Sequence, residues 1–193
     1  ILIGNGANNV LDGATGADTL IGGLGDDSVY GGIGNDALYA GDGNDSILAS
    51  DGNDILDGGN GNDILMGKGG NDILVGGLGA DDMQGQADND LYYVDNALDY
   101  VRERGGEGYD HVITTVTFDL AAQGNGEVEL FQAAAGTAAI NLYGNYHTNW
   151  IVGNDANNVI DGRTGADTMQ GGAGNDVYYV DDARDVVLDT QGY

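Results

Sequence analysis

Aspartates recur every nine residues through the first half of the chain, and this spacing is the strongest indication of chemistry in the sequence. Each one stands sixth in a unit of the form Gly-Gly-x-Gly-x-Asp-x-apolar-x, and ten such units follow one another from Gly4 to Tyr93, with Asn9 as the exception. Carboxylates beside glycines, whose backbone leaves carbonyl oxygens uncovered, form a hard oxygen donor set. The sixth-position aspartates are Asp18, Asp27, Asp36, Asp45, Asp54, Asp63, Asp72, Asp81 and Asp90.

The chemistry that this donor set favours is calcium binding. The chain has no Cys and only two His, which leaves little for zinc or copper, and abundant carbonyls on a flexible backbone suit calcium better than magnesium. The formal net charge of -27 calls for cations and repels nucleic acid and anionic membranes. Neither His111 nor His147 belongs to a zinc-helix, nucleophile-elbow or phosphate-loop motif, so no catalytic residue is predicted.

The elements that must position the aspartates follow from the rest of the unit. We expect the last three positions to form a short strand, and the first six to turn the chain with glycines that permit positive backbone torsions. A three-residue strand does not persist alone, so the units must stack and share one thin core. The core residues stand at position eight and are Leu11, Leu20, Val29, Leu38, Ile47, Leu56, Leu65, Leu74, Met83 and Tyr92.

Copies such as GGLGDDSVY from Gly22 and GGNGNDILM from Gly58 resemble the RTX (repeats-in-toxin) hemolysin-type calcium-binding nonapeptide repeats. The resemblance covers residues 4–93 and 144–179. It implies an all-β fold, a right-handed parallel β-roll or β-solenoid with two nonapeptides per turn. It also implies Ca2+ between loops two units apart, and export by the type I secretion route.

The resemblance further implies which atoms hold each ion. Carbonyls of positions one and three plus the aspartate come from one loop, and carbonyls of positions two and four plus the aspartate come from the loop two units later. The implied ligands are Gly22, Leu24 and Asp27 with Gly41, Gly43 and Asp45 in one column, and Gly31, Ile33 and Asp36 with Ser50, Gly52 and Asp54 in the other.

Seven pairs of loops two units apart have aspartate in both members, which predicts about seven calcium ions and offsets about half of the net charge. The pairs are Asp27/Asp45, Asp45/Asp63, Asp63/Asp81, Asp18/Asp36, Asp36/Asp54, Asp54/Asp72 and Asp72/Asp90. The same rule adds the carbonyls of Gly13, Thr15, Gly32, Gly34, Gly59, Gly61, Gly77 and Gly79.

A second block of nonapeptides, from Gly144, has a weaker set of carboxylates. Asn149 and Asn158 occupy position six there, and only Asp167 and Asp176 remain as acidic candidates. Asparagine favours turns, so we expect Asn149 and Asn158 to form turns or a hydrogen-bonded ladder rather than to act as full ligands. Sites that contain them, or Asn9, should be weak or empty.

The sequence predicts four segments. Residues 1–95 form the first RTX β-roll block, 96–143 a β-rich connector or cap, 144–182 a second, degenerate block, and 183–193 the start of a further connector. We expect Tyr92 and Tyr93 to close the core of the first roll. The stretch from Ile1 repeats from Trp150, so the chain is expected to be an excerpt of a longer array.

We therefore expect a calcium-binding region of a large secreted or cell-surface bacterial protein, which folds on calcium binding after export and serves as a structural or adhesive module. The expected partners are calcium ions, neighbouring repeat modules and cell-surface or lattice subunits, without nucleic acid or membrane insertion. The alternatives are a non-catalytic accessory domain of a secreted protease, lipase or polysaccharide epimerase, the repeat region of a pore-forming toxin, and a surface-layer lattice protein. Any catalytic domain would lie outside this chain.

Overall fold

The computed structural model describes residues 1–103, 108–123 and 127–189. The chain forms two compact units, Ile1–Arg102 and Glu103–Tyr193, called unit 1 and unit 2 below. Residues 104–107 and 124–126 of the predicted connector, and 190–193 of the predicted final segment, lie outside the described residues.

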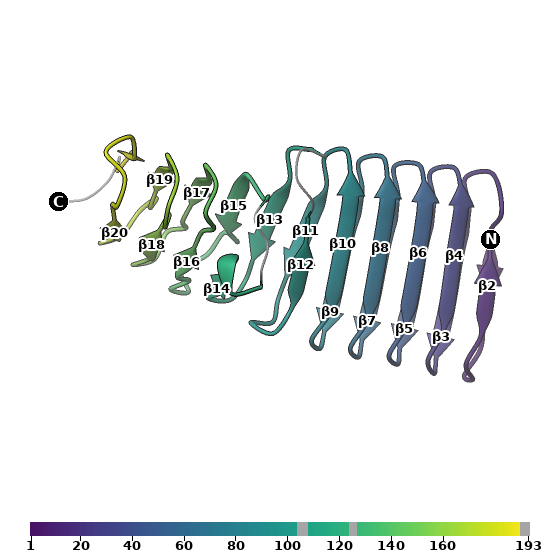
Figure 1. The fold of residues 1–193 in the computed structure, drawn as a ribbon. Coiled ribbons are helices and arrows are strands. Elements are labelled where there is room, and N and C mark those ends of the chain that lie inside the picture. Colours follow the sequence, from purple (N-terminus) through teal and green to yellow (C-terminus); the bar gives the residue numbers. More distant parts are fainter. Residues whose placement is uncertain (104–107, 124–126, 190–193) are drawn as a thin grey trace. The chain divides into compact units, whose positions relative to one another are not determined.

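Unit 1 is built of two parallel sheets whose strands alternate along the chain (Figure 1). Because consecutive nonapeptides supply strands to opposite sheets, one turn of the solenoid contains two nonapeptides. One sheet contains β1 (Leu2–Ile3), β3 (Thr19–Leu24), β5 (Ala37–Asp42), β7 (Ile55–Asn60), β9 (Ile73–Leu78) and β11 (Leu91–Val94), and the other contains β2 (Val10–Asp12), β4 (Ser28–Ile33), β6 (Ser46–Asp51), β8 (Ile64–Gly69), β10 (Asp82–Ala87) and β12 (Tyr100–Arg102).

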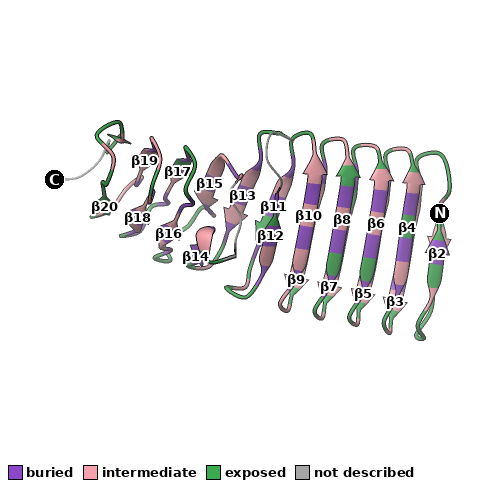
Figure 2. Ribbon diagram, in the orientation of Figure 1, coloured by how far each residue is buried: buried purple, intermediate pink, exposed green. Residues whose placement is uncertain are grey.

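The core of unit 1 is the predicted stack of position-eight residues. Each lies opposite its counterpart two nonapeptides away, as Leu20 does opposite Leu38 and Leu56 opposite Leu74. From Leu20 to Tyr92 these side chains are fully buried, and Figure 2 shows the buried band crossing the middle of β4, β6, β8 and β10. Tyr92 lies inside the core as expected, whereas Tyr93 points outward and is 40% exposed.

The predicted strand length is wrong for unit 1. Its central strands are six residues long and run from position seven of one nonapeptide through position three of the next, as in Thr19–Leu24. Parallel pairing continues into the glycine-rich part, where Gly23 lies opposite Gly41 and Leu24 opposite Asp42. Only positions four to six turn the chain, because a backbone that pairs with an identical neighbour keeps its hydrogen bonds in the ladder.

An eleventh nonapeptide ends unit 1. Residues 94–102 carry Asp99 at position six and Val101 at position eight, and Val101 is fully buried opposite Met83. The sequence predicts an end of the repeats at Tyr93 because this copy lacks glycine at positions one, two and four. On β12 the Arg102 guanidinium lies 2.9 Å from an Asp82 oxygen and 4.7 Å from the centre of the Tyr100 ring.

Unit 2 repeats the architecture with shorter strands. Segments of the predicted connector pair with the later nonapeptides in the same parallel manner, as Phe131 does with Ile151 and Leu142 with Ile160. One sheet contains β13 (His111–Thr114), β15 (Leu130–Ala133), β17 (Trp150–Val152), β19 (Thr168–Gln170) and β21 (Val186–Val187), and the other contains β14 (Phe118–Asp119), β16 (Leu142–Tyr143), β18 (Val159–Asp161) and β20 (Val177–Tyr179), with a 3-10 helix at Ala121–Gln123.

Candidate metal centre

From Asp27 onward, the sixth-position aspartates of unit 1 form two columns of buried carboxylates. In each pair, Oδ1 of the later aspartate accepts the backbone N–H of the aspartate eighteen residues earlier: Asp45 from Asp27 at 2.6 Å, and Asp63 from Asp45 at 2.7 Å. The aspartates from Asp27 to Asp90 are at most 3% exposed. The structure therefore brings together loops two nonapeptides apart.

The second oxygen of these carboxylates is the unusual feature. Buried polar atoms nearly always have a hydrogen-bond partner, and a buried charge without one is strongly destabilising. Such an oxygen requires a cation or a proton. The buried Oδ2 atoms that lack a partner belong to Asp27, Asp36, Asp45, Asp54, Asp63, Asp72 and Asp81 in unit 1, and to Asp167 and Asp176 in unit 2.

The unpaired oxygens face a break in the strand ladder. In the paired six-residue strands the register passes through positions seven, eight, nine, two and three but skips position one: Ile21 pairs with Tyr39 and Gly23 with Gly41. A Cβ added to Gly31, at position one, would lie 2.6 Å from Oδ2 of Asp36 and 2.9 Å from the Ala49 carbonyl oxygen. A carboxylate oxygen and a carbonyl oxygen thus flank one buried point.

Position one is glycine for space rather than for torsion, which corrects the sequence interpretation. Positive φ occurs at positions two and four, for example 117° at Gly41 and 146° at Gly43, but not at Gly13, Gly22 or Gly31 among the described residues. A side chain at position one would approach the carboxylate oxygen of its own loop. Ala40 and Ala49 show that a methyl group is tolerated at two such positions, where both residues are fully buried.

Burial changes the protonation of these carboxyl groups. Desolvation raises the pKa of Asp54 and Asp63 to about 6, and that of Asp72 and Asp81 to about 7, although each accepts a backbone hydrogen bond that lowers it. The neighbouring aspartate of the column adds to the rise by repulsion. Without a cation, Asp72 and Asp81 therefore hold protons up to near neutral pH, and Asp54 and Asp63 up to about pH 6.

The donor set fits calcium. The converging atoms are carboxylate and carbonyl oxygens, which are hard ligands, and no thiol exists in the chain. A divalent cation beside Oδ2 would satisfy the unpaired oxygen and offset the repulsion between successive aspartates.

The predicted backbone ligands lie at positions one to four of the loops. The carbonyl of Ile33, at position three, already accepts the Gly16 N–H at 2.7 Å and has one lone pair left. The Ala49 carbonyl at position one, which with Asp36 Oδ2 flanks the space beside Gly31, was not among the predicted ligands. Positive φ is found at the predicted ligands Gly32, Gly41, Ser50, Gly59 and Gly77 of position two and Gly34, Gly43, Gly52, Gly61 and Gly79 of position four, whereas Thr15 and Leu24 at position three lack it.

Position five contributes a ladder that the sequence analysis missed. The side chain of Asn44 accepts the N–H of Asn62 at 2.9 Å, and that of Asn62 accepts the N–H of Ala80 at 2.8 Å. This ladder runs forward along the stack, opposite in sense to the position-six ladder beside it. A periodic signal existed, because eight of the ten copies have Asn or Asp at position five: Asn8, Asp26, Asn35, Asn44, Asn53, Asn62, Asn71 and Asn89.

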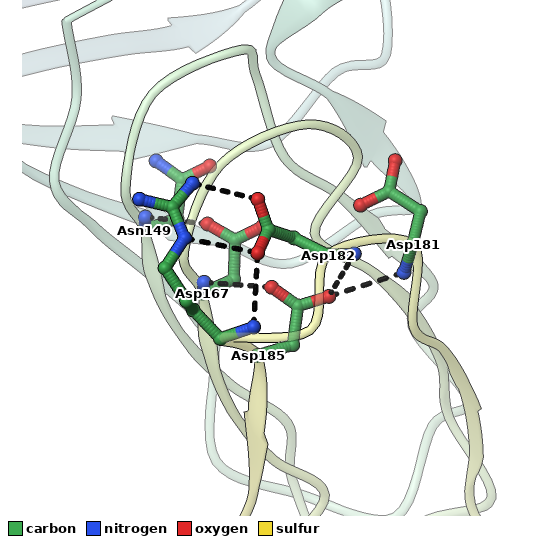
Figure 3. Close-up of polar contacts among 6 residues, drawn as sticks. Asn149, Asp167, Asp181, Asp182 and Asp185 are labelled. Carbon is green, nitrogen blue, oxygen red and sulfur yellow. Dashed lines mark hydrogen bonds and ion pairs between the residues drawn. The ribbon is translucent and has the colours of Figure 1, made fainter.

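Unit 2 continues the carboxylate column with fewer members. Oδ1 of Asp167 accepts the N–H of Asn149 at 2.7 Å, and Oδ1 of Asp185 accepts the N–H of Asp167 at 3.0 Å (Figure 3). Asp185 was not predicted as a site residue, and neither was Asp99, the corresponding residue of unit 1. Burial raises the pKa of Asp167 to about 6, as in the columns of unit 1.

The family profile of the RTX calcium-binding nonapeptide repeat matches residues 3–38, 30–65, 39–74, 57–92, 66–99 and 143–187, which is more than half of the chain. A comparison with curated proteins finds no significant match. In the part of the chain that the structure describes, no helix has the length and apolar character needed to cross a membrane. The chain belongs to the RTX family of calcium-binding nonapeptide repeats, and its β-roll is a calcium-binding structural module.

Proposed function

We propose that this chain is a calcium-switched module of a large secreted or cell-surface bacterial protein, in which calcium converts a disordered chain into a stiff structural or adhesive rod. The observation that carries the proposal is the row of buried carboxylate oxygens without a partner. Because calcium binds these oxygens only when the loops are stacked, its binding free energy becomes folding free energy.

The properties of the metal-free chain support a calcium-dependent folding switch. The core of unit 1 contains one position-eight side chain from each nonapeptide, and the net charge of -27 opposes compaction. Members of the family are typically secreted, and calcium is scarce inside bacteria but millimolar outside. The chain would therefore stay extended for export and fold on arrival, and any catalytic activity of the parent protein would lie in another domain.

The proposed sites are the seven aspartate pairs of unit 1, each between loops two nonapeptides apart. Asp167 and Asp176 are proposed as weaker ligands in unit 2, since each has one unpaired buried oxygen but an asparagine neighbour in the column. The predicted carbonyls of positions one to four complete the coordination.

Circular dichroism tests the switch directly. The chain should show only a small part of its β signal in chelator, gain the rest in millimolar calcium and gain much less in millimolar magnesium. A full β signal in chelator would contradict the proposal.

A matched pair of variants connects the switch to the columns. Asp45→Asn removes a fully buried carboxylate that belongs to two proposed sites, whereas Asp51→Asn removes the same charge from an exposed position. Asp45→Asn should raise the calcium concentration at the folding midpoint, and Asp51→Asn should leave it nearly unchanged. Equal shifts would show that only net charge matters.

A further inference from the structure

The nonapeptide turns among the described residues fall into two classes, which differ in the backbone at position two. In the open class φ is positive there, and the N–H of position two does not reach the side chain of position six. In the closed class that N–H donates to the position-six side chain. Position two of the open turns is Ala14, Gly23, Gly32, Gly41, Ser50, Gly59, Lys68, Gly77, Gln86, Arg163 and Gly172, and that of the closed turns is Asn5, Asp95, Asn145, Asn154 and Asp181.

The closed turns with asparagine at position six are fully paired. The Asn145 N–H donates to Oδ1 of Asn149 at 3.0 Å, and the Asn145 side chain accepts the His147 N–H at 2.8 Å. The Asn149 amide then donates from Nδ2 to the Val128 carbonyl at 2.7 Å. Both polar atoms of the Asn149 side chain are therefore occupied.

The next turn repeats this arrangement. The Asn154 N–H donates to Oδ1 of Asn158 at 2.9 Å, and Nδ2 of Asn158 donates to the Ile140 carbonyl at 2.8 Å. At the start of unit 1, Oδ1 of Asn9 accepts the Asn5 N–H at 2.8 Å in the same way. In all three turns the side-chain oxygen at position six therefore already accepts a hydrogen bond from position two of its own turn.

The closed turns with aspartate at position six also satisfy both oxygens. Oδ2 of Asp99 accepts the N–H groups of Asp95 at 3.2 Å and Asn96 at 3.0 Å, while its Oδ1 accepts the Asp81 N–H. Asp185 does the same with Asp181 and Asp182, both at 3.1 Å (Figure 3). These carboxylates lack the unpaired oxygen of the open turns.

We infer that the closed turns bind no calcium and that the pair at Asn145–Asn149 and Asn154–Asn158 remains folded in its absence. This inference rests on the proposed function, in which the open turns are the calcium sites. Three observations carry it. The side-chain amides of Asn149 and Asn158 donate to backbone carbonyls, these side chains carry no charge, and both residues are 1% exposed. The adjoining core of unit 2 contains the edge-to-face pair of Phe118 and Phe131, which is fully or almost fully buried. Unit 2 thus supplies a calcium-independent template for the open turns that follow.

Amide hydrogen exchange of the whole chain, resolved by residue, tests the inference. In chelator, the N–H groups of Asn145 and Asn154 should exchange about tenfold or more slowly than those of Asp27 and Asp45, the factor that about 1.4 kcal/mol of local stability gives. In millimolar calcium both groups should be protected. Equal, fast exchange of all four in chelator would overturn the inference alone, and equal protection of all four would overturn the calcium switch.

A matched pair of variants provides a second readout. Asn158→Asp replaces the donor that faces the Ile140 carbonyl with an acceptor, so protection of Asn154 in chelator should be lost. Asn157→Asp adds the same charge at the preceding residue, which is exposed. The Asn157 side chain accepts the Asn175 N–H at 2.8 Å, and an aspartate would accept this hydrogen bond equally well. Asn157→Asp should leave the exchange unchanged, and identical behaviour of the two variants would contradict the role assigned to the amide.

Discussion

Unit 1 and unit 2 are built from the same kind of nonapeptide repeat, but their strands differ in length. The central strands of unit 1 are six residues long, whereas β17, β18, β19 and β20 of unit 2 are three residues long. Two open turns stacked on each other continue the ladder through positions two and three. In unit 2 each open turn lies eighteen residues from a closed one, so the ladder ends at position nine. The torsion at position two therefore decides whether the carboxylate of that turn keeps a free oxygen, and the torsions of two stacked turns together decide the strand length.

The difference does not reduce to glycine content. Ser50, Lys68 and Gln86 keep positive φ at position two of unit 1, with values of 94°, 90° and 83°. A residue with a Cβ pays roughly 1–2 kcal/mol for this conformation. The stacked neighbours of unit 1 supply that energy, because each loop is hydrogen-bonded through positions five and six to the loop two nonapeptides away.

The largest expected effect comes from removing a carboxylate in the middle of a column. Asp63 belongs to two of the proposed pairs and Asp18 to one. Asp63→Asn should abolish two calcium sites and Asp18→Asn one, as measured by isothermal titration calorimetry. Equal losses would mean that ions are not shared between loops two units apart.

The next effect separates torsion from crowding. Gly43 in unit 1 and Gly136 in unit 2 have nearly the same φ, 146° and 148°, but a Cβ on Gly43 would meet the Gly25 backbone whereas none of the described atoms lies within 4 Å at Gly136. Gly136→Ala should cost about 1–2 kcal/mol, the torsional part alone. Gly43→Ala should cost about 1–3 kcal/mol more. Denaturant unfolding in calcium measures both, and equal costs would remove the argument from close stacking.

Acid should weaken calcium binding at Asp72 and Asp81 of unit 1 before it affects Asp167 of unit 2. Because the folded metal-free pKa of Asp72 and Asp81 is about 7, against about 6 for Asp167, protons compete with calcium first at Asp72 and Asp81. Calcium affinity should fall about tenfold per titrating ligand between pH 8 and pH 6. Titrations at both pH values measure the change, and affinity independent of pH would contradict it.

Acid has the opposite effect on the metal-free chain, whose folded state it should stabilise. The folded-state pKa values of Asp72 and Asp81 lie above the unfolded value, so the folded state binds more protons between them. The destabilisation of the folded state by these two carboxylates is complete above pH 7 and disappears as the pH falls toward 4. Circular dichroism in chelator should therefore show more β structure at pH 5 than at pH 8, and the reverse order would contradict the burial of unpaired carboxylates.

The smallest effect belongs to the position-five ladder. Asn62→Ala removes the acceptor for the Ala80 N–H on an exposed edge and should cost about 0.5–1.5 kcal/mol. Asn62→Asp keeps the acceptor and should cost less. Ala17 and Ala80 occupy position five naturally, which agrees with a small contribution. Thermal unfolding in calcium compares the two, and a loss larger than that of Gly43→Ala would reverse the order.

Position eight and position six were predictable because each has a single physical requirement. A side chain that points into the core must be apolar, and the charged ligand of a hard cation must be a carboxylate. The residue type and the nine-residue spacing therefore predict the roles of Leu20 and Asp27. Position one misled, because glycine serves torsion and space equally well in a sequence. The eleventh copy at Val94–Arg102 was missed because its closed turn, bonded through Asp99, needs no glycine.

The nonapeptide sequence by itself determined the fold class, the period of the core and the kind of metal, since these depend on residue type and spacing alone. The tertiary structure decided which carboxylates keep an unpaired oxygen. That outcome depends on the backbone torsion at position two and on the partner eighteen residues away, as the contrast of Asp45 with Asp99 shows. Both are aspartates at position six, and only the stacked loops around them make one a free ligand and the other a closed turn.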